Sequence, residues 1–220
     1  MKYFYLIVVT LFAISCTNNI CKSKPISGYV YIDMEKEISL SQLIEIRKTL
    51  IEAEIDRMGE ISGYDSNKHS LQLKIYTSFG DTENEKLFVL EKINSKWMAK
   101  ELRYQFDISA MQDTIYIRIN AIKDLTPQIS WEAFYDSLRS SNIFKLSGDH
   151  TLEGYEESMG IVDGVEVVFR DKSDSNRYSY REIELNKKFR EVEDLDKVLN
   201  FIEGTFDGKY IYRSCFFREK

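Results

Sequence analysis

The sequence predicts an α+β fold, with a mainly antiparallel sheet built from hairpins and about three amphipathic helices. Three stretches carry apolar residues at the helical period, whereas the stretches between them alternate apolar and polar residues, as half-buried strands do. The chain has 220 residues, of which 43% are hydrophobic and 30% are charged. This length and composition suffice for a buried core, in one domain or in two small ones.

A short strand and a long helix open the predicted globular region. Residues 28–33 are rich in the β-forming residues tyrosine, valine and isoleucine, and Ser39 with Gln42 has the pattern of a helix capping box. Apolar residues then recur at helical spacing as far as Met58. Gly59 follows, where a C-terminal cap needs a residue that tolerates positive φ. We therefore expect a helix between Ser39 and Gly59.

An antiparallel meander is predicted next. Apolar and polar residues alternate over 71–76, and residues 86–93 and 96–106 flank Asn94-Ser95, a sequence suited to a tight hairpin turn. Residues 114–120 alternate isoleucine with tyrosine and arginine. These segments are expected to pair in sequence order.

Pro127 marks the best internal boundary, because a proline after a turn residue interrupts a sheet. Ser130 is expected to cap a second helix, and residues 165–169 are expected to pair with 178–185 as a hairpin. The globular region 28–220 is then either one domain or two subdomains, 28–122 and 129–220.

The last helix and the last strand complete the prediction. Apolar residues form one helical stripe from Val192 to Phe206, and Gly204 stands near its end. Residues 210–217 are rich in β-forming residues. We expect a helix over the stripe and a strand that closes the chain.

The first 16 residues have the pattern of an export signal. Lys2 precedes an apolar stretch of about 12 residues, which is too short to span a bilayer. The sequence Ala13-Ile14-Ser15-Cys16 resembles the lipobox of bacterial lipoproteins, although Ala13 stands where lipoboxes usually carry leucine. The resemblance implies that residues 1–15 are a cleaved signal peptide and that Cys16 carries two acyl chains. Export with ordinary cleavage and no lipid is the alternative.

Lipidation predicts a location as well as a modification. Residues 16–27 would comprise the lipidated cysteine and a short polar tether, which holds the globular part at a membrane of the cell envelope, facing the periplasm or the exterior. Cys21 and Cys215 would then be the remaining thiols, an even number that permits one disulfide outside the reducing cytosol. The alternative is a free thiol at Cys21 and a buried, apolar Cys215.

Motifs for nucleotide and metal binding are incomplete. The segment Gly204 to Lys209 lacks the hydroxyl residue of a phosphate loop and follows a helix instead of preceding one. Asp171 and Asp174 lie in a polar stretch that begins like a calcium loop, but the glycine and glutamate that an EF-hand requires are missing. We interpret these segments as a helix cap with a turn and as a hairpin turn.

His69 and His150, the only histidines, are expected in surface loops, without the neighbours of a catalytic triad or a zinc site. The sequence therefore predicts no catalytic residues, no metal and no cofactor. Acidic groups such as Glu156-Glu157 keep a hydrolase based on carboxylates open as an alternative.

Tyrosine and phenylalanine are the one compositional excess, with 14 and 13 residues. Tyrosines on predicted strands form a candidate binding face, because a solvent-facing tyrosine row offers apolar area with a polar tip to a sugar or a partner protein. Packing within the sheet and core is the alternative. The candidate face consists of Tyr29, Tyr31, Tyr116, Tyr178, Tyr180, Tyr210 and Tyr212.

These observations together predict an envelope lipoprotein that acts as a binding or interaction module for an unidentified protein or glycan. The formal net charge of −6 and the lack of basic clusters in the sequence argue against a nucleic-acid partner. The alternatives are a hydrolase that uses carboxylates and a periplasmic inhibitor or immunity-type protein that blocks one partner.

Overall fold

The computed structural model describes residues 28–31, 40–59, 61, 63–79, 85–109, 114–156 and 163–206. Within these ranges the predicted α+β fold with an antiparallel sheet is confirmed. The predicted signal peptide and tether, all three cysteines (Cys16, Cys21 and Cys215), and the tyrosines Tyr210 and Tyr212 lie outside the described residues.

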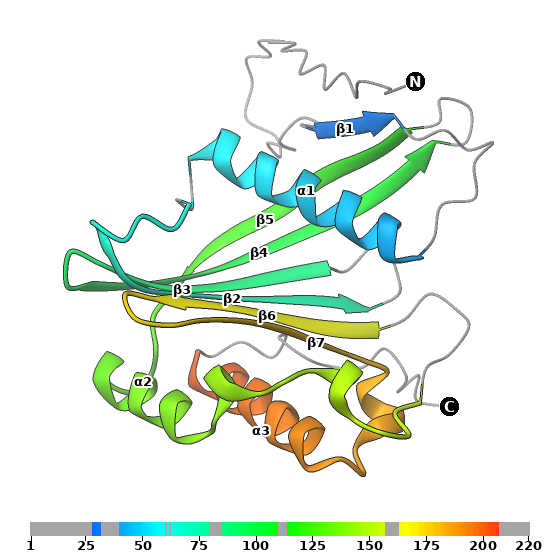
Figure 1. The fold of residues 1–220 in the computed structure, drawn as a ribbon. Coiled ribbons are helices and arrows are strands. Elements are labelled where there is room, and N and C mark those ends of the chain that lie inside the picture. The colour runs from blue at the N-terminus through cyan, green and yellow to red at the C-terminus, as the bar shows by residue number, and fades with distance from the viewer. Residues whose placement is uncertain are drawn as a thin grey trace, which may run out of the picture. The chain divides into compact units, whose positions relative to one another are not determined.

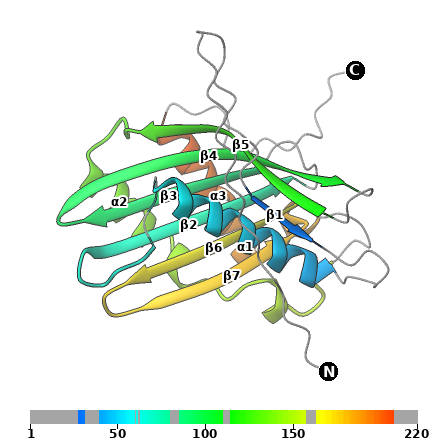
Figure 2. The ribbon, with the colours of Figure 1, turned by 90° about the horizontal axis from the view of Figure 1, so that it is seen from above.

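In the described ranges, seven strands form the sheet, in the order β1-β5-β4-β3-β2-β6-β7. Four pairs of neighbouring strands are antiparallel: β1 with β5, β2 with β3, β2 with β6, and β6 with β7. Figure 2 shows β3, β2, β6 and β7 side by side. The strands are β1 (Gly28–Tyr31), β2 (His69–Phe79), β3 (Glu85–Ile93), β4 (Lys96–Ser109), β5 (Thr114–Leu125), β6 (Asp163–Asp171) and β7 (Ser175–Arg181).

The chain divides into two compact units, but not at the predicted boundary. The first unit contains the described residues up to Gly63 together with Tyr104–Asn120, and the second contains Tyr64–Arg103 together with the described residues from Ala121 onwards. β2 pairs with β6 inside the second unit, so strands from both sides of Pro127 share one sheet. Pro127 therefore marks the passage from β5 to the next helix, and the two compact units do not coincide with the alternative division into 28–122 and 129–220.

The first unit contains α1 (Leu40–Met58), β1 and parts of β4 and β5. The helix buries Leu50, Ile51 and Ile55. Gly59 has φ +64° and its N–H donates to the carbonyl oxygen of Ile55 at 3.2 Å, which is the left-handed C-terminal cap that the sequence predicts. No helix in the described ranges combines a membrane-spanning length with a sufficiently apolar composition.

In the second unit, α2 (Trp131–Ser140) and α3 (Arg190–Thr205) lie on one side of β2, β6 and β7 (Figure 1). The core forms between these helices and the sheet, from inward strand residues such as Leu73 and Val167 and helix residues such as Phe134 and Leu199. Ser130 caps α2 as predicted, because its Oγ accepts from the Ala133 N–H at 3.2 Å.

Both predicted hairpins of this unit are present, with one difference. Asn94 and Ser95 join β3 to β4 with φ values of +48° and +66°, the left-handed pair that a two-residue turn requires. The β6–β7 hairpin also forms, but its second strand ends at Arg181 instead of Leu185. Glu182 has φ +49°, which turns the chain into the 3₁₀ helix η3 (Ile183–Asn186).

Candidate functional site

The tyrosine row predicted from the sequence is not a continuous solvent face. Tyr178 is 3% exposed and Tyr180 is 0% exposed, because alternate residues of β7 point into the core of the second unit. These two tyrosines therefore cannot contribute to an exposed binding face. Tyr210 and Tyr212 lie outside the described residues.

Tyr178 and Tyr180 instead bind an irregular segment, residues 142–156, which we call the strap. It contains two short 3₁₀ helices, η1 (Ile143–Lys145) and η2 (Asp149–Thr151). The Tyr178 hydroxyl donates to the carbonyl oxygen of Ile143 at 2.6 Å, and the Gly148 N–H donates to the Tyr180 oxygen at 3.3 Å. Burial raises the pKa of both tyrosines, that of Tyr180 to about 12.

The far end of the strap binds the end of β7. Asp149, which is 4% exposed, accepts from the Arg181 side-chain Nε at 2.9 Å and from the Arg181 backbone N–H at 3.2 Å through the same carboxylate oxygen. The Tyr155 hydroxyl donates to the Arg181 carbonyl oxygen. The backbone N–H and carbonyl oxygen of Arg181 thus both have hydrogen-bond partners in the strap. The strap thereby covers this end of the edge strand β7.

Three of the predicted tyrosine positions share one region of the first unit. The register places position 29 opposite Tyr116 and position 31 opposite Thr114, so these positions fall on the same face of the β1–β5 pair. Tyr116 is half-buried. On the neighbouring strands, Arg118 pairs with Asp107 at 3.0 Å and Asn120 donates to Gln105 at 3.0 Å.

His69 lies in a buried polar cluster, so the expected surface position is wrong for this residue. Its side chain is 1% exposed, and Nδ1 accepts from the Asp65 N–H at 3.0 Å. Nε2 lies 3.5 Å from a carboxylate oxygen of Glu91, which also accepts from Gln72 at 2.6 Å. β2 begins at His69, and the pleat together with the register against β3 buries this side chain. His150 is exposed, as expected.

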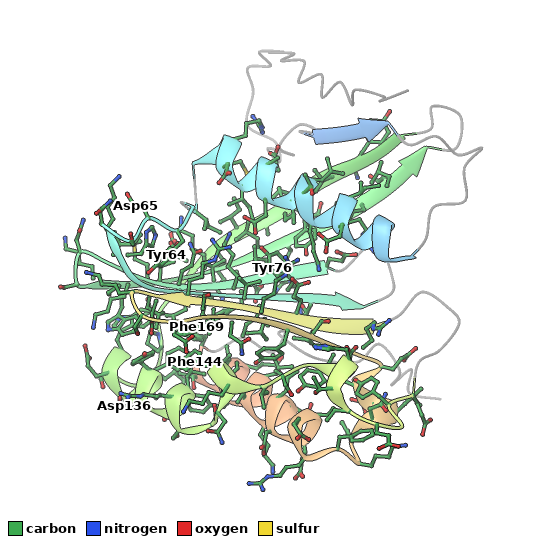
Figure 3. The ribbon with its side chains drawn as sticks, viewed as in Figure 1. Tyr64, Asp65, Tyr76, Asp136, Phe144 and Phe169 are labelled. Atoms are coloured by element: carbon green, nitrogen blue, oxygen red, sulfur yellow. The ribbon has the colours of Figure 1, made fainter. Side chains whose placement is uncertain are left out.

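The His69 cluster has hydrogen-bonding partners but little contact with solvent. Glu91 is 4% exposed and Gln72 is 4% exposed. Tyr64 lies beside His69, with ring centroids 5.4 Å apart, and its buried hydroxyl has no hydrogen-bond partner among the described residues. Figure 3 shows Tyr64 and Asp65 on the side of the sheet opposite Phe144 and Phe169. A buried pair of this kind can orient neighbouring strands, but it offers no open position to a substrate.

The calcium-like stretch is a hairpin turn, as interpreted from the sequence. One oxygen of Asp171 accepts from the N–H groups of Ser173 and Asp174, each at 2.7 Å. Partial burial raises the pKa of the Asp171 carboxyl, but these hydrogen bonds outweigh it and hold the pKa below its usual value. In the described ranges, no group of three or more histidine, cysteine, aspartate and glutamate side chains is arranged to hold a metal ion.

A cluster of aromatic side chains at the surface of the second unit was not singled out from the sequence. It consists of Trp97 on β4, Trp131 and Tyr135 on α2, and Lys92 on β3, and we call it the aromatic patch. The Trp97 ring lies 6.2 Å from Trp131 at an interplanar angle of 11°, and 5.2 Å from Tyr135. All four side chains are half-buried, so each retains some exposed surface.

Buried phenylalanines pack against the inner side of the aromatic patch. Trp131 lies 6.0 Å from the ring of Phe206, and Tyr135 lies 6.0 Å from the ring of Phe144. The Phe144 ring in turn lies 4.3 Å from the Phe169 ring, tilted by 32°, and Figure 3 shows both phenylalanines between the sheet and the helices. The patch is therefore the exposed end of a continuous set of aromatic contacts that reaches into the core, and these contacts restrict the Trp131 and Tyr135 rings.

Two polar features distinguish the aromatic patch from ordinary core packing. The indole N–H of Trp97 is buried and has no hydrogen-bond acceptor in the described part of the chain, which ordinarily costs about 1–3 kcal/mol. Burial raises the pKa of the Tyr135 hydroxyl, and the Asp171 carboxylate raises it further. Arg139 lowers this pKa, and Asp136 adds a smaller increase. Polar groups of both signs thus surround the rings.

The chain offers one sequence signal for this cluster. It contains only 2 tryptophans, and each stands beside a reliable local signal: Trp97 just after the Asn94-Ser95 turn and Trp131 just after the helix cap Ser130. No protein-family model, curated protein or solved structure matches the chain significantly.

Proposed function

We propose that this protein is a lipid-anchored protein of the bacterial cell envelope that acts as a binding module, and that the aromatic patch contacts its partner. The lipobox-like sequence before Cys16 supports the location. The observation that carries the binding function is the set of half-buried, mutually packed rings of Trp97, Trp131 and Tyr135. The partner is a protein or a glycan.

Rings of this kind suit recognition for a physical reason. Tryptophan and tyrosine bury a large area with few rotatable bonds, so they lose little conformational entropy on binding and dominate the energetics of many interfaces. In the aromatic patch, contacts with Phe206 and Phe144 already restrict Trp131 and Tyr135. The side chains of Trp131 and Tyr135 therefore lose less conformational entropy when a partner binds.

The unpartnered Trp97 N–H supports the same interpretation. A buried donor without an acceptor lowers the stability of the fold, so its presence in a native protein calls for an explanation. A phenylalanine at this position would bury a similar ring without the unmet donor. The indole at position 97 is thus better explained by recognition than by packing alone.

The anchor and the patch are tested separately in cells. Metabolic labelling with palmitate should label the wild-type protein and not Cys16→Ala, and only the wild type should require detergent for extraction. If the wild type takes up no label and partitions into buffer, the envelope anchor is wrong.

For the patch, the native anchored protein is photocrosslinked in its own membranes, next to the variant Trp131→Ser. We expect Trp131→Ser to lose a crosslinked species that the wild type captures. Phe189→Ala is the matched control, because Phe189 is also half-buried and stacks on Tyr155 at 5.6 Å outside the patch. Thermal melting of each variant verifies that it is folded. Identical crosslinks in wild type and folded Trp131→Ser would refute a binding role for the patch.

A further inference from the structure

The Trp97 ring already holds a cation. The Lys92 ammonium lies 4.5 Å from the centroid of this ring, within the range of a cation–π interaction. Lys92 and Trp97 approach each other because they flank the two-residue turn Asn94-Ser95, near the ends of β3 and β4. The structure thus shows that the ring face accommodates an alkylammonium group.

The charged groups around the aromatic patch are two carboxylates, Asp171 and Asp136, and two cations, Lys92 and Arg139. Asp171 raises the pKa of the Tyr135 hydroxyl more than Arg139 lowers it, and Asp136 raises it by less than either. The whole chain carries a formal net charge of −6. Aromatic ring faces carry a negative electrostatic potential, so the rings and the carboxylates attract the same sign of charge.

We propose that the aromatic patch binds a lysine side chain of a partner protein, which takes the place of the Lys92 ammonium over Trp97. This inference rests on the proposed binding function and specifies its partner. The displaced Lys92 has a flexible four-carbon stem and a half-buried position, so its ammonium can return to water while the partner's ammonium regains the ring contact.

A neutral sugar fits the same surface less well. A sugar ring needs an open aromatic face. Lys92 lies over the Trp97 ring, and Trp131 and Tyr135 pack beside Trp97. Displacing Lys92 with a neutral ring would forfeit the cation–π contact without replacing it. Exchange of one ammonium for another keeps that contact.

The test uses intrinsic fluorescence, because both tryptophans of the chain belong to the aromatic patch. The purified protein is titrated with the tripeptide Gly-Lys-Gly, acetylated at its N-terminus and amidated at its C-terminus. It is also titrated with the same capped peptide carrying norleucine or acetyl-lysine in place of lysine, and with a neutral oligosaccharide. We expect only the lysine peptide to change the emission, because only it carries an ammonium.

Removal of the internal competitor gives the sharpest readout. Lys92→Met retains the apolar stem and eliminates the ammonium, so it should tighten binding of the lysine peptide by roughly two- to fivefold, the size of a surface cation–π contact. Lys188→Met is the matched control, because the Lys188 ammonium lies 5.4 Å from the Phe189 ring outside the patch. This control should bind the peptide as the wild type does.

The outcomes separate this inference from the proposed function. An equal response to the norleucine peptide, a response to the oligosaccharide alone, or no lysine response in either wild type or Lys92→Met would overturn lysine recognition. If crosslinks nevertheless depend on Trp131, the binding module stands with a different ligand. Equal tightening by Lys92→Met and Lys188→Met would show that overall charge, and not the patch, controls the peptide.

Discussion

The hydroxyl of Tyr178 offers a direct test of how the strap is held. Tyr178→Phe retains the buried ring and its contact with Tyr180 at 5.7 Å, so no cavity forms. It removes the donor to the carbonyl oxygen of Ile143, which is 2.6 Å away on a residue that is 0% exposed. A buried acceptor left without a donor costs about 1–3 kcal/mol in the free energy of unfolding.

Tyr64→Phe is the matched control for this prediction. The Tyr64 hydroxyl is also buried, but it has no hydrogen-bond partner among the described residues. Its removal should therefore leave the free energy of unfolding unchanged or raise it by up to about 1 kcal/mol, because an unsatisfied polar group disappears. Both variants remove one hydroxyl from a tyrosine, but only Tyr178→Phe is expected to lower the free energy of unfolding.

Chemical denaturation of the protein without its predicted signal measures both effects, with tyrosine and tryptophan emission as the signal. Since a change of 1 kcal/mol shifts the Tm of a protein this size by about 2–4 °C, thermal melts give a second measurement. Faster hydrogen exchange in residues 142–156 should accompany Tyr178→Phe. If Tyr178→Phe is as stable as Tyr64→Phe, the Tyr178 bond does not hold the strap.

Three further predictions concern other parts of the chain. The pKa of Tyr180 is raised to about 12, so the folded state binds this proton more tightly than the unfolded state. The contribution of Tyr180 to stability should therefore be constant below pH 10 and be lost between pH 10 and 12. Denaturation midpoints between pH 10 and 12 should fall less steeply for Tyr180→Phe. Ser95→Gly should raise the free energy of unfolding by about 0.5–1 kcal/mol, because Ser95 has φ +66° and glycine adopts that conformation without a Cβ clash; a loss of stability in urea titrations would contradict this. Thiol counting under denaturing conditions should find a Cys21–Cys215 disulfide in protein isolated from its own envelope, and two reactive thiols without reductant would exclude it.

Local signals in the sequence predict the elements of this fold well. The apolar period and Gly59 predict α1, and Asn94-Ser95 predicts the β3–β4 turn, because each signal acts through contacts within a few residues. The end of β7 was missed because Glu182 adopts a left-handed conformation that its residue type rarely takes. Nothing adjacent in the sequence encodes that turn.

The burial of Tyr178 and Tyr180 had a signal that the tyrosine-row interpretation overlooked. Both alternate with Arg177 and Ser179, so the more polar face of β7 is the opposite one. The partners of these tyrosines were not predictable, since the strap precedes them by some thirty residues in an irregular conformation.

Long-range geometry also creates the aromatic patch and the His69 cluster. Trp97 and Trp131 lie on different elements, and only the packing of α2 on the sheet brings their rings together. His69 meets Glu91 across the β2–β3 pair, at a point where the register shifts. Sequence periodicity predicts which face a residue occupies, but not which distant residue lies opposite.

The position of β2 between β3 and β6 has a consequence for how the chain folds. β2 and β3 are adjacent in the sequence, so their pairing closes a short loop. β2 and β6 are far apart in the sequence, and their register runs from Phe79↔Asp163 to Leu71↔Asp171. Such distant contacts pay a larger loop-closure entropy and form late. Before β6 pairs with β2 during folding, the backbone groups along that edge of β2 have no partner strand. A strand of a second copy of the chain can then pair with this edge. Refolding yield should therefore fall as protein concentration rises.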